Sequence, residues 1–213
     1  MKKHIMLAFD MDGTITKTAK LLREEGIREF HKRGMVEAIQ YAIDNPEGST
    51  LLWPQYMRDI TDEIVREGTF MLRVEPTEIV QQGLLNEIAV IRRMSWNKRL
   101  DTCVCTHRGF HDKGVEYTGQ WLSQNDAIHV MDNIHAIDPS VHPNKLKFLE
   151  EVYPDHEIRL LDDNPLFRTD VPHEYDERLC IVSEEGVVPG YANQNQFPGV
   201  YTFARNIRDM LLA

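Results

Sequence analysis

The feature that most constrains the fold of this chain is an alternation of short, mostly apolar runs with amphipathic helical stretches. The first run occupies residues 5–9 and ends at Asp10. A strand that is apolar on both faces is typical of a parallel sheet covered by helices on two sides. Comparable runs follow at residues 102–106, 127–131 and 158–161, with weaker ones at 180–182 and 200–203. We expect these six runs to be strands.

Between these runs, apolar residues recur at helical spacing. The two clearest sets are Val80, Leu84, Ile88 and Ile91 before the second run, and Leu146, Leu149 and Val152 before the fourth. Apolar residues three or four positions apart form one face of a helix that packs on a sheet. Strands that alternate with helices predict an α/β fold with a doubly wound parallel sheet, a Rossmann-like core.

Residues 17–75 interrupt this alternation, because they contain amphipathic helical patterns and no convincing strand. Pro54 is well placed to open one of these helices. We expect residues 17–75 to form a helical insertion, and residues 1–16 together with 76–213 to form the α/β core. The apolar faces of the insertion are Met35, Val36, Ile39, Ala42 and Ile43 on one helix and Tyr56, Ile60 and Ile64 on another.

The composition excludes some classes of function. A formal net charge of −10 disfavours a non-specific grip on nucleic acid, because phosphate backbones are held by clustered Lys and Arg. The first apolar run is too short for a secretory signal or a membrane span, so we expect a cytoplasmic protein with no membrane partner. Three cysteines, Cys103, Cys105 and Cys180, lie within apolar stretches and are expected to be buried, reduced thiols.

The first strand is followed directly by two acids, Asp10 and Asp12, and by Gly13. This position is the carboxyl edge of a parallel sheet, where open α/β sheets bind ligands. Two carboxylates so close together repel each other, and a hard cation such as Mg²⁺ relieves the repulsion. One acid can then attack phosphorus while the other handles the proton of the leaving group. An Asp-x-Asp-Gly turn also occurs in ordinary loops, so this pair alone does not define a site.

Three further polar elements lie at or beside the predicted ends of later strands. Thr106 ends the second strand and can donate its hydroxyl to a phosphoryl oxygen. Lys145 opens a helix and would supply positive charge to the nucleophile and the transferring group. Asp162 and Asp163 end the fourth strand and would complete a magnesium site with carboxylate oxygen. The ordered set is far more specific than any one of its members.

Together these segments resemble the four motifs of phosphatases of the haloacid dehalogenase superfamily, over roughly residues 5–165. The motifs are Asp10-Met11-Asp12-Gly13-Thr14, Thr106, Lys145 and Asp162-Asp163. The resemblance implies an aspartyl-phosphate intermediate that water hydrolyses, with Asp10 as the nucleophile and Asp12 as the general acid and base. It implies that Thr106 and Lys145 bind the phosphoryl group, and that residues 17–75 are a C1-type cap.

The same resemblance implies a Mg²⁺ ion held by motif carboxylates and one backbone carbonyl, which would be that of Met11. The carboxylates from which we expect the metal site are those of Asp10, Asp12, Asp162 and Asp163. Dehalogenases of the superfamily resemble this sequence but lack a carboxylate at the position of Asp12. We therefore expect an enzyme, a magnesium-dependent phosphomonoesterase, with a nucleotide or another small phosphate ester as its substrate.

Arg108 is the residue that bears most on the choice of substrate. The pattern Thr106-x-Arg108, with the adjacent acids before Asn164, is similar to the 3′-phosphatase domain of polynucleotide kinase-phosphatases. Arg108 would then bind a substrate phosphate or a flanking group, although it is equally compatible with an ordinary loop arginine. No P-loop pattern for a kinase domain is present, so this alternative is a stand-alone phosphatase acting on a nucleic-acid 3′ end.

Two other interpretations stay open. His107 or His111 could lie at the mouth of the site and meet the leaving group, whereas a transition-metal site built from them is disfavoured. The chain could also be a binding protein that keeps the fold and the acids without catalysis. The sequence does not define an oligomeric state.

Overall fold

A six-stranded parallel sheet forms the centre of the computed structural model, which describes residues 4–46, 50–94, 100–163, 176–182, 195–197 and 200–212. The strand order is β3-β2-β1-β4-β5-β6. The strands are β1 (His4–Phe9), β2 (Leu100–Thr106), β3 (Asn133–Ala136), β4 (His156–Leu161), β5 (Leu179–Val182) and β6 (Asn195–Phe197). The predicted α/β class with a parallel sheet is confirmed.

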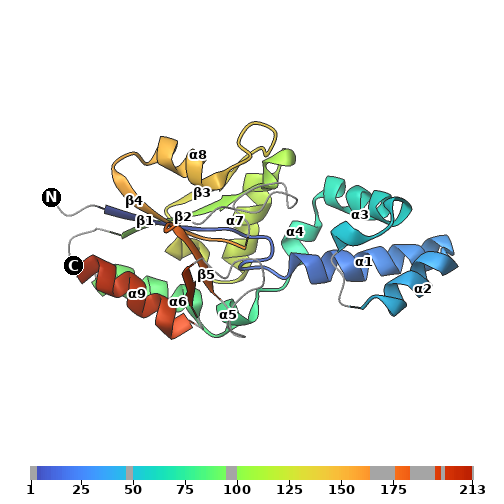
Figure 1. The fold of residues 1–213 in the computed structure, drawn as a ribbon, viewed down its shortest axis with the longest axis horizontal. Helices are drawn as coiled ribbons and strands as arrows, with labels where there is room; N and C mark the ends of the chain where they lie inside the picture. The colour runs from blue at the N-terminus through green and yellow to red at the C-terminus, as the bar shows by residue number, and fades with distance from the viewer. Residues whose placement is uncertain are drawn as a thin grey trace.

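Helices cover both faces of this sheet, as Figure 1 shows. Alternate residues of β1 point to opposite faces: Ile5, Leu7 and Phe9 join one buried cluster, and Met6 and Ala8 join the other. The first cluster is shared with α6 (Leu84–Met94), α7 (Gly114–Gln124) and α9 (Val200–Leu212), and the second with α8 (Lys145–Val152). The sheet is therefore doubly wound, and all three cysteines are free and buried as expected.

Two predicted strands are wrong. Residues 128–130 form a 3₁₀ turn, and the strand β3 begins only at Asn133. The sheet pairing starts at Asp132, whose amide donates to the carbonyl of Thr102 and whose carboxylate accepts from the amide of Thr102. Residues 200–203 open helix α9, on which Phe203 and Ile207 are buried four positions apart. A run of four or five apolar residues does not distinguish a strand from one buried turn of a helix.

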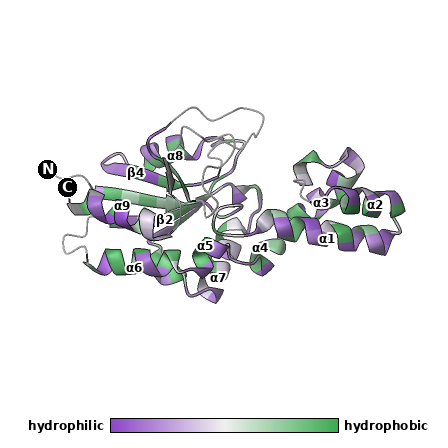
Figure 2. Ribbon diagram, turned by 60° about the horizontal axis from the view of Figure 1, so that its bottom comes forward, coloured by the Kyte–Doolittle hydropathy of each residue, from purple (hydrophilic) through white to green (hydrophobic). Residues whose placement is uncertain are grey.

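Four helices lie between β1 and the short helix α5 (Glu78–Gln81), outside the layers of the sheet (Figures 1 and 2). They are α1 (Thr18–Arg33), α2 (Val36–Asp44), α3 (Gln55–Glu67) and α4 (Phe70–Arg73), and we call them the helical insertion. Figure 2 shows hydrophobic and hydrophilic residues on each of α1–α3. Their buried faces meet in a separate core of Phe30, Ala38, Ala42, Trp53, Met57 and Ile60.

The predicted apolar face of α2 is only partly correct. Ala42 is buried, but Val36 and Ile43 are 74% and 63% exposed. The core of the insertion contacts the face of α2 that carries the small residues Ala38 and Ala42. Small side chains let the helices approach closely. The sequence-based prediction placed the larger apolar residues Val36 and Ile43 on the buried face of α2 instead.

The insertion contacts the sheet domain through α4. Phe70 and Met71 are buried in a cluster with Ile64, and Tyr117 of α7 packs against this cluster. Among the described residues, no helix combines the length and the apolar character needed to cross a membrane.

Candidate active site

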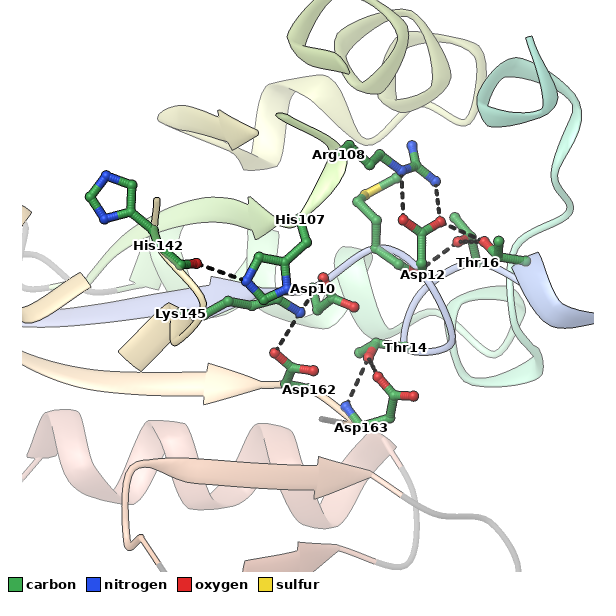
Figure 3. A network of polar contacts seen from close by, with 12 residues as sticks. Asp10, Asp12, Thr14, Thr16, His107, Arg108, His142, Lys145, Asp162 and Asp163 are labelled. Carbon is green, nitrogen blue, oxygen red and sulfur yellow. Dashed lines mark hydrogen bonds and ion pairs between the residues drawn. The ribbon is translucent and has the colours of Figure 1, made fainter. Parts of the chain in front are cut away.

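A buried lysine lies between two buried acids at the carboxyl edge of the sheet (Figure 3). The register that pairs Phe9 with Leu161 brings Asp10 and Asp162 to the ends of neighbouring strands. The Nζ atom of Lys145 lies 2.7 Å from Oδ1 of Asp10 and 2.9 Å from Oδ2 of Asp162. All three residues are at most 3% exposed. The ammonium therefore compensates two carboxylates that water does not reach.

The position of Lys145 is set by the start of helix α8. The side chain of Asn144 accepts hydrogen bonds from the amides of Leu146 and Lys147 and so caps the helix. Because the cap fixes the first turn, Lys145 projects from a defined point toward the end of β1. The cap at Asn144 thus accounts for the placement of Lys145. Among the described residues, Lys145 is the only charged residue of α8 that is buried.

Asp163 is held by the turn that follows β1. The amide of Asp163 donates to the hydroxyl of Thr14 at 3.1 Å. Gly13 has a φ of +87°, and a Cβ atom at this position would lie 2.7 Å from a carboxylate oxygen of Asp163. Only glycine combines this left-handed backbone with so close an approach. The turn after the first strand thus brings Asp163 against the motif that contains Asp10.

Three carboxylates of this edge lie close enough together to hold a metal ion. Ligand atoms of Asp10, Asp162 and Asp163 all lie within 4.8 Å of one another. Burial raises the pKa of Asp10 to about 7. The positive charge of Lys145 acts to lower this pKa, and the negative charge of Asp162 acts to raise it. Three acids around one ammonium leave an excess of negative charge, and an oxygen-rich set of this kind suits a hard divalent cation. The donor set fits the metal that the motifs imply.

Two predicted metal ligands are not part of this group. The carbonyl of Met11 accepts hydrogen bonds from the amides of Thr14, Ile15 and Thr16 and from the hydroxyl of Thr16. It closes the turn, and its role as a metal ligand stays a prediction. The carboxylate of Asp12 is also directed elsewhere, toward Arg108 (Figure 3).

Asp12 and Arg108 form a two-pronged ion pair. Nε of Arg108 lies 2.9 Å from Oδ2 of Asp12, and Nη2 lies 2.7 Å from Oδ1. The hydroxyl of Thr18 donates to the same Oδ1 at 2.6 Å. Burial acts to raise the pKa of Asp12, but the Arg108 charge and these hydrogen bonds outweigh it, so the pKa is lowered.

The placement of Arg108 does not fit its predicted contact with substrate. Its side chain is 0% exposed, and its guanidinium fork is occupied by Asp12. The similarity to polynucleotide 3′-phosphatases depended largely on this arginine. Asn164, which also entered that similarity, lies outside the described residues.

Thr106 and His107 lie at the end of β2. The hydroxyl of Thr106 is buried and has no hydrogen-bond partner among the described residues, which is costly unless a ligand supplies one. Nε2 of His107 lies 3.1 Å from the carbonyl of His142. Burial, with the nearby charge of Lys145, lowers the pKa of His107 to about 4, so its imidazole is neutral at neutral pH.

His111 lies at the junction of the two parts of the chain. Its ring is 5.5 Å from that of Tyr117, and a Cβ atom at Gly68 would lie 2.5 Å from its Nε2. Gly68 ends helix α3. The sequence offered His111 as a group at the mouth of the site, whereas the structure brings it against the insertion, at the turn between α3 and α4.

Sequence reasoning did not find Thr18. This residue opens helix α1 and contacts Asp12 from the side of the insertion. A sequence signal was available, because threonines alternate from the last residue of the motif onward, at Thr14, Thr16 and Thr18. In the structure each of them makes a side-chain hydrogen bond within the turn or to an acid.

We expect the metal-free protein to lose stability as pH rises from about 4 to about 7. The pKa of Asp10 is about 7 in the folded protein and near its usual value of 3.8 when unfolded. The folded state therefore binds more protons in this range, and the free energy of unfolding falls as they are released. Saturating Mg²⁺ should remove most of this fall, because it replaces the proton.

Urea unfolding at about pH 5 and about pH 7.5, with EDTA and then with Mg²⁺, measures this effect. The Asp10→Asn variant is the control and should show a smaller fall in EDTA. A wild-type stability that stays level or rises with pH in EDTA would contradict the expectation.

Gly114→Ala should destabilise the protein by about 1–3 kcal/mol, because a Cβ atom there overlaps the carbonyl oxygen of Arg108 and lies 2.9 Å from its carbonyl carbon. Gly119→Ala, in the same helix, is the matched control. Its new Cβ atom would meet only Ile134 at 3.5 Å, so helix propensity should stabilise it by up to about 1 kcal/mol. Chemical denaturation of both variants measures the difference, and equal effects would contradict the close packing around Arg108.

Open α/β sheets bind their ligands at the carboxyl edge of the strands, and this chain carries three acids and a lysine at that edge. No protein-family model matches the chain, and no curated protein is detectably similar in sequence. Solved structures do match over nearly the whole chain. The chain is similar to a haloacid dehalogenase-like family hydrolase from Streptococcus pneumoniae, with a TM-score of 0.54, 11% identity and coverage of 97% of this chain and 100% of that one.

A structure described as a predicted phosphatase, from Clostridium acetobutylicum, matches with a TM-score of 0.54 and 11% identity, over 97% of this chain and 99% of that one. The chain therefore has the haloacid dehalogenase-like hydrolase fold, as the motif resemblance predicted. At this level of identity the likeness concerns the fold alone, and the chemistry has to be argued from the site.

Proposed function

We propose that this protein is a magnesium-dependent phosphomonoesterase that acts on small phosphate esters through an aspartyl-phosphate intermediate. The observation that carries the proposal is the buried ammonium of Lys145, 2.7 Å from Asp10 and 2.9 Å from Asp162. It keeps the candidate nucleophile oriented and offers positive charge where a phosphoryl group would transfer. The unpartnered hydroxyl of Thr106 supports the same proposal, because a phosphoryl oxygen would satisfy it.

In the first step a carboxylate oxygen of Asp10 attacks phosphorus, and the bond from phosphorus to the ester oxygen breaks. Asp12 is a carboxylate in the ligand-free protein, because the charge and hydrogen bonds of Arg108 lower its pKa against the effect of burial, so it has to take up a proton as the ester binds. Asp12 then gives that proton to the departing oxygen, and the products are an alcohol and a phosphorylated Asp10. In the second step Asp12 takes a proton from water, which attacks the same phosphorus. The bond to Asp10 breaks, inorganic phosphate leaves, Asp10 is a carboxylate again and Asp12 carries the proton for the next turnover.

Asp10, Asp162 and Asp163 would hold the Mg²⁺ ion. When bound, it supplies positive charge that offsets the repulsion between a phosphate dianion and a carboxylate nucleophile. Lys145 neutralises part of the same charge. The neutral His107 imidazole near Lys145 adds no further charge at the site.

The helical insertion is proposed to be the cap that covers the site and selects the substrate. Its first helix begins at Thr18, directly after the turn that carries Asp12, and its last helix packs on α7. Elements that close over a site exclude water and add contacts to the part of the substrate that leaves.

Other functions are less well supported. A dehalogenase has no use for a second acid at the position of Asp12. A binding protein would keep the buried Asp10–Lys145–Asp162 group at an energetic cost without using it. The nucleic-acid alternative depended on Arg108, which is buried, and the net charge of −10 also disfavours it.

The proposal is tested by assaying the purified protein with Mg²⁺ and with EDTA. The panel contains an aryl phosphate, sugar phosphates, nucleoside 5′- and 3′-monophosphates, a 3′-phosphorylated oligonucleotide and a 2-haloacid. We expect Mg²⁺-dependent release of phosphate from small esters. Halide release from the haloacid, or binding of phosphate esters without turnover, would contradict the proposal.

A further inference from the structure

The two oxygens of Asp12 are held from two different parts of the molecule. Arg108 belongs to the turn after β2, in the sheet domain, and binds both oxygens. Thr18 is the first residue of α1, in the helical insertion, and binds Oδ1. Asp12 is thus the point at which the sheet domain and the insertion meet at the candidate site (Figure 3).

Arg108 is the fixed side of this arrangement. Its side chain is 0% exposed, and Nη1 lies 3.5 Å from the hydroxyl of Thr118 on α7. The neighbouring Gly109 has no room for a side chain, because a Cβ atom would lie 2.6 Å from the amide nitrogen of Asp138. The turn that carries Arg108 is therefore packed backbone against backbone within the sheet domain, and its position does not depend on the insertion.

Thr18 is the side that depends on the insertion. It is 8% exposed, and its hydroxyl lies 2.9 Å from that of Thr16 as well as 2.6 Å from Asp12. The amide of Lys17 donates to the carbonyl of Glu75, so the two segments of chain that connect the insertion to the sheet domain are bonded directly beside Thr18. A rotation of α1 about this crossing would move the Thr18 hydroxyl relative to Asp12.

We propose that Arg108 and Thr18 are positioning residues that act through Asp12, and that Thr18 makes the orientation of Asp12 depend on the placement of the helical insertion. The inference rests on the proposed function, in which Asp12 serves the leaving group. Arg108 aligns the plane of the carboxylate. Thr18 completes that alignment only when α1 is in place, so protonation of the leaving group is coupled to the cap.

The test compares two esters, an alkyl phosphate that needs a proton on its leaving oxygen and a p-nitrophenyl phosphate that needs little help. Thr18→Val removes the hydroxyl and keeps the shape, and Thr18→Ser keeps the hydroxyl as the matched control. We expect Thr18→Val to lower kcat/KM, which reports only the first step, about tenfold for the alkyl ester and less than about twofold for the aryl ester, because one charge-assisted hydrogen bond is lost. Thr18→Ser should stay within about twofold of wild type for both.

Equal losses on the two esters, or no loss on either, would overturn the inference. A faster alkyl reaction in Thr18→Val would also overturn it, because it would mean that Thr18 restrains Asp12. Wild-type protein is measured first, with Mg²⁺. If wild type hydrolyses neither ester, both the proposed function and the inference are contradicted. If wild type is active and the Thr18 variants are unaffected, only the inference is contradicted.

A double-mutant cycle tests Arg108 in the same way. Arg108→Met keeps much of the buried volume, and its effect is measured in wild type and in Asp12→Asn. If Arg108 acts through Asp12, the loss on the alkyl ester should largely disappear in the Asp12→Asn background. The same loss in both backgrounds would overturn the role of Arg108. Should Arg108→Met fail to fold, the Thr18 pair still decides the proposal.

Discussion

Asp10→Asn is expected to reduce turnover to less than about one per cent of wild type, because an amide oxygen cannot replace a carboxylate as the nucleophile. The substitution is nearly isosteric and removes one of three mutually repelling carboxylates. The fold should therefore be retained, and the free energy of unfolding at neutral pH in EDTA should not fall. Steady-state kinetics with each active ester and urea unfolding measure the two effects.

The matched control is Asp155→Asn, an exposed acid before β4, which should leave both quantities unchanged. Deamidation of the introduced asparagine in Asp10→Asn would restore the nucleophile, so the mass of the purified variant is checked before each assay. Turnover clearly above one per cent in intact variant protein would contradict the assignment of Asp10.

Lys145→Met is expected to have the second-largest effect, on stability as well as on rate. The substitution leaves Asp10 and Asp162 buried without their ammonium, and breaking a buried ion pair in this way costs about 3–5 kcal/mol. Loss of the positive charge at the transferring group should lower kcat by about a hundredfold or more. Mg²⁺ should restore part of the stability, because it compensates the same carboxylates.

Urea unfolding with and without Mg²⁺, together with kcat on the most active ester, measures these effects. Lys147→Met, at an exposed position of the same helix, is the control and should be close to wild type. A Lys145→Met protein that is as stable and as active as this control would mean that the lysine is not part of the site.

The parts of the fold that could be predicted are those in which a local sequence pattern is compatible with only one secondary structure. The strands β1, β2 and β4 lie in the sheet interior, and each was marked by a mostly apolar run that ends in a polar residue. Residues 128–130 and 200–203 are similar apolar runs, but they form a 3₁₀ turn and the start of a helix. An apolar run predicts that its side chains are buried, and it does not predict the backbone conformation.

The site divides in the same way. Asp10, Lys145, Asp162 and Asp163 were placed from strand ends and from a helix start, and the structure brings these four together. The ion pair between Asp12 and Arg108 joins residues 96 positions apart, and nothing in the local sequence of either one specifies the partner. The hydrogen bonds to the carbonyl of Met11 depend on how tightly the turn closes, which the local sequence does not specify.

The central claim is that Asp10 becomes phosphorylated, and the most direct measurement is to trap that species. Wild-type protein is mixed with the most active ester and Mg²⁺, quenched in acid within one turnover and treated with borohydride, which reduces an acyl phosphate to an alcohol. Peptide mass spectrometry should then find homoserine in place of Asp10, and in no other aspartate. Turnover without any modification of Asp10, or trapping at a different residue, would contradict the account.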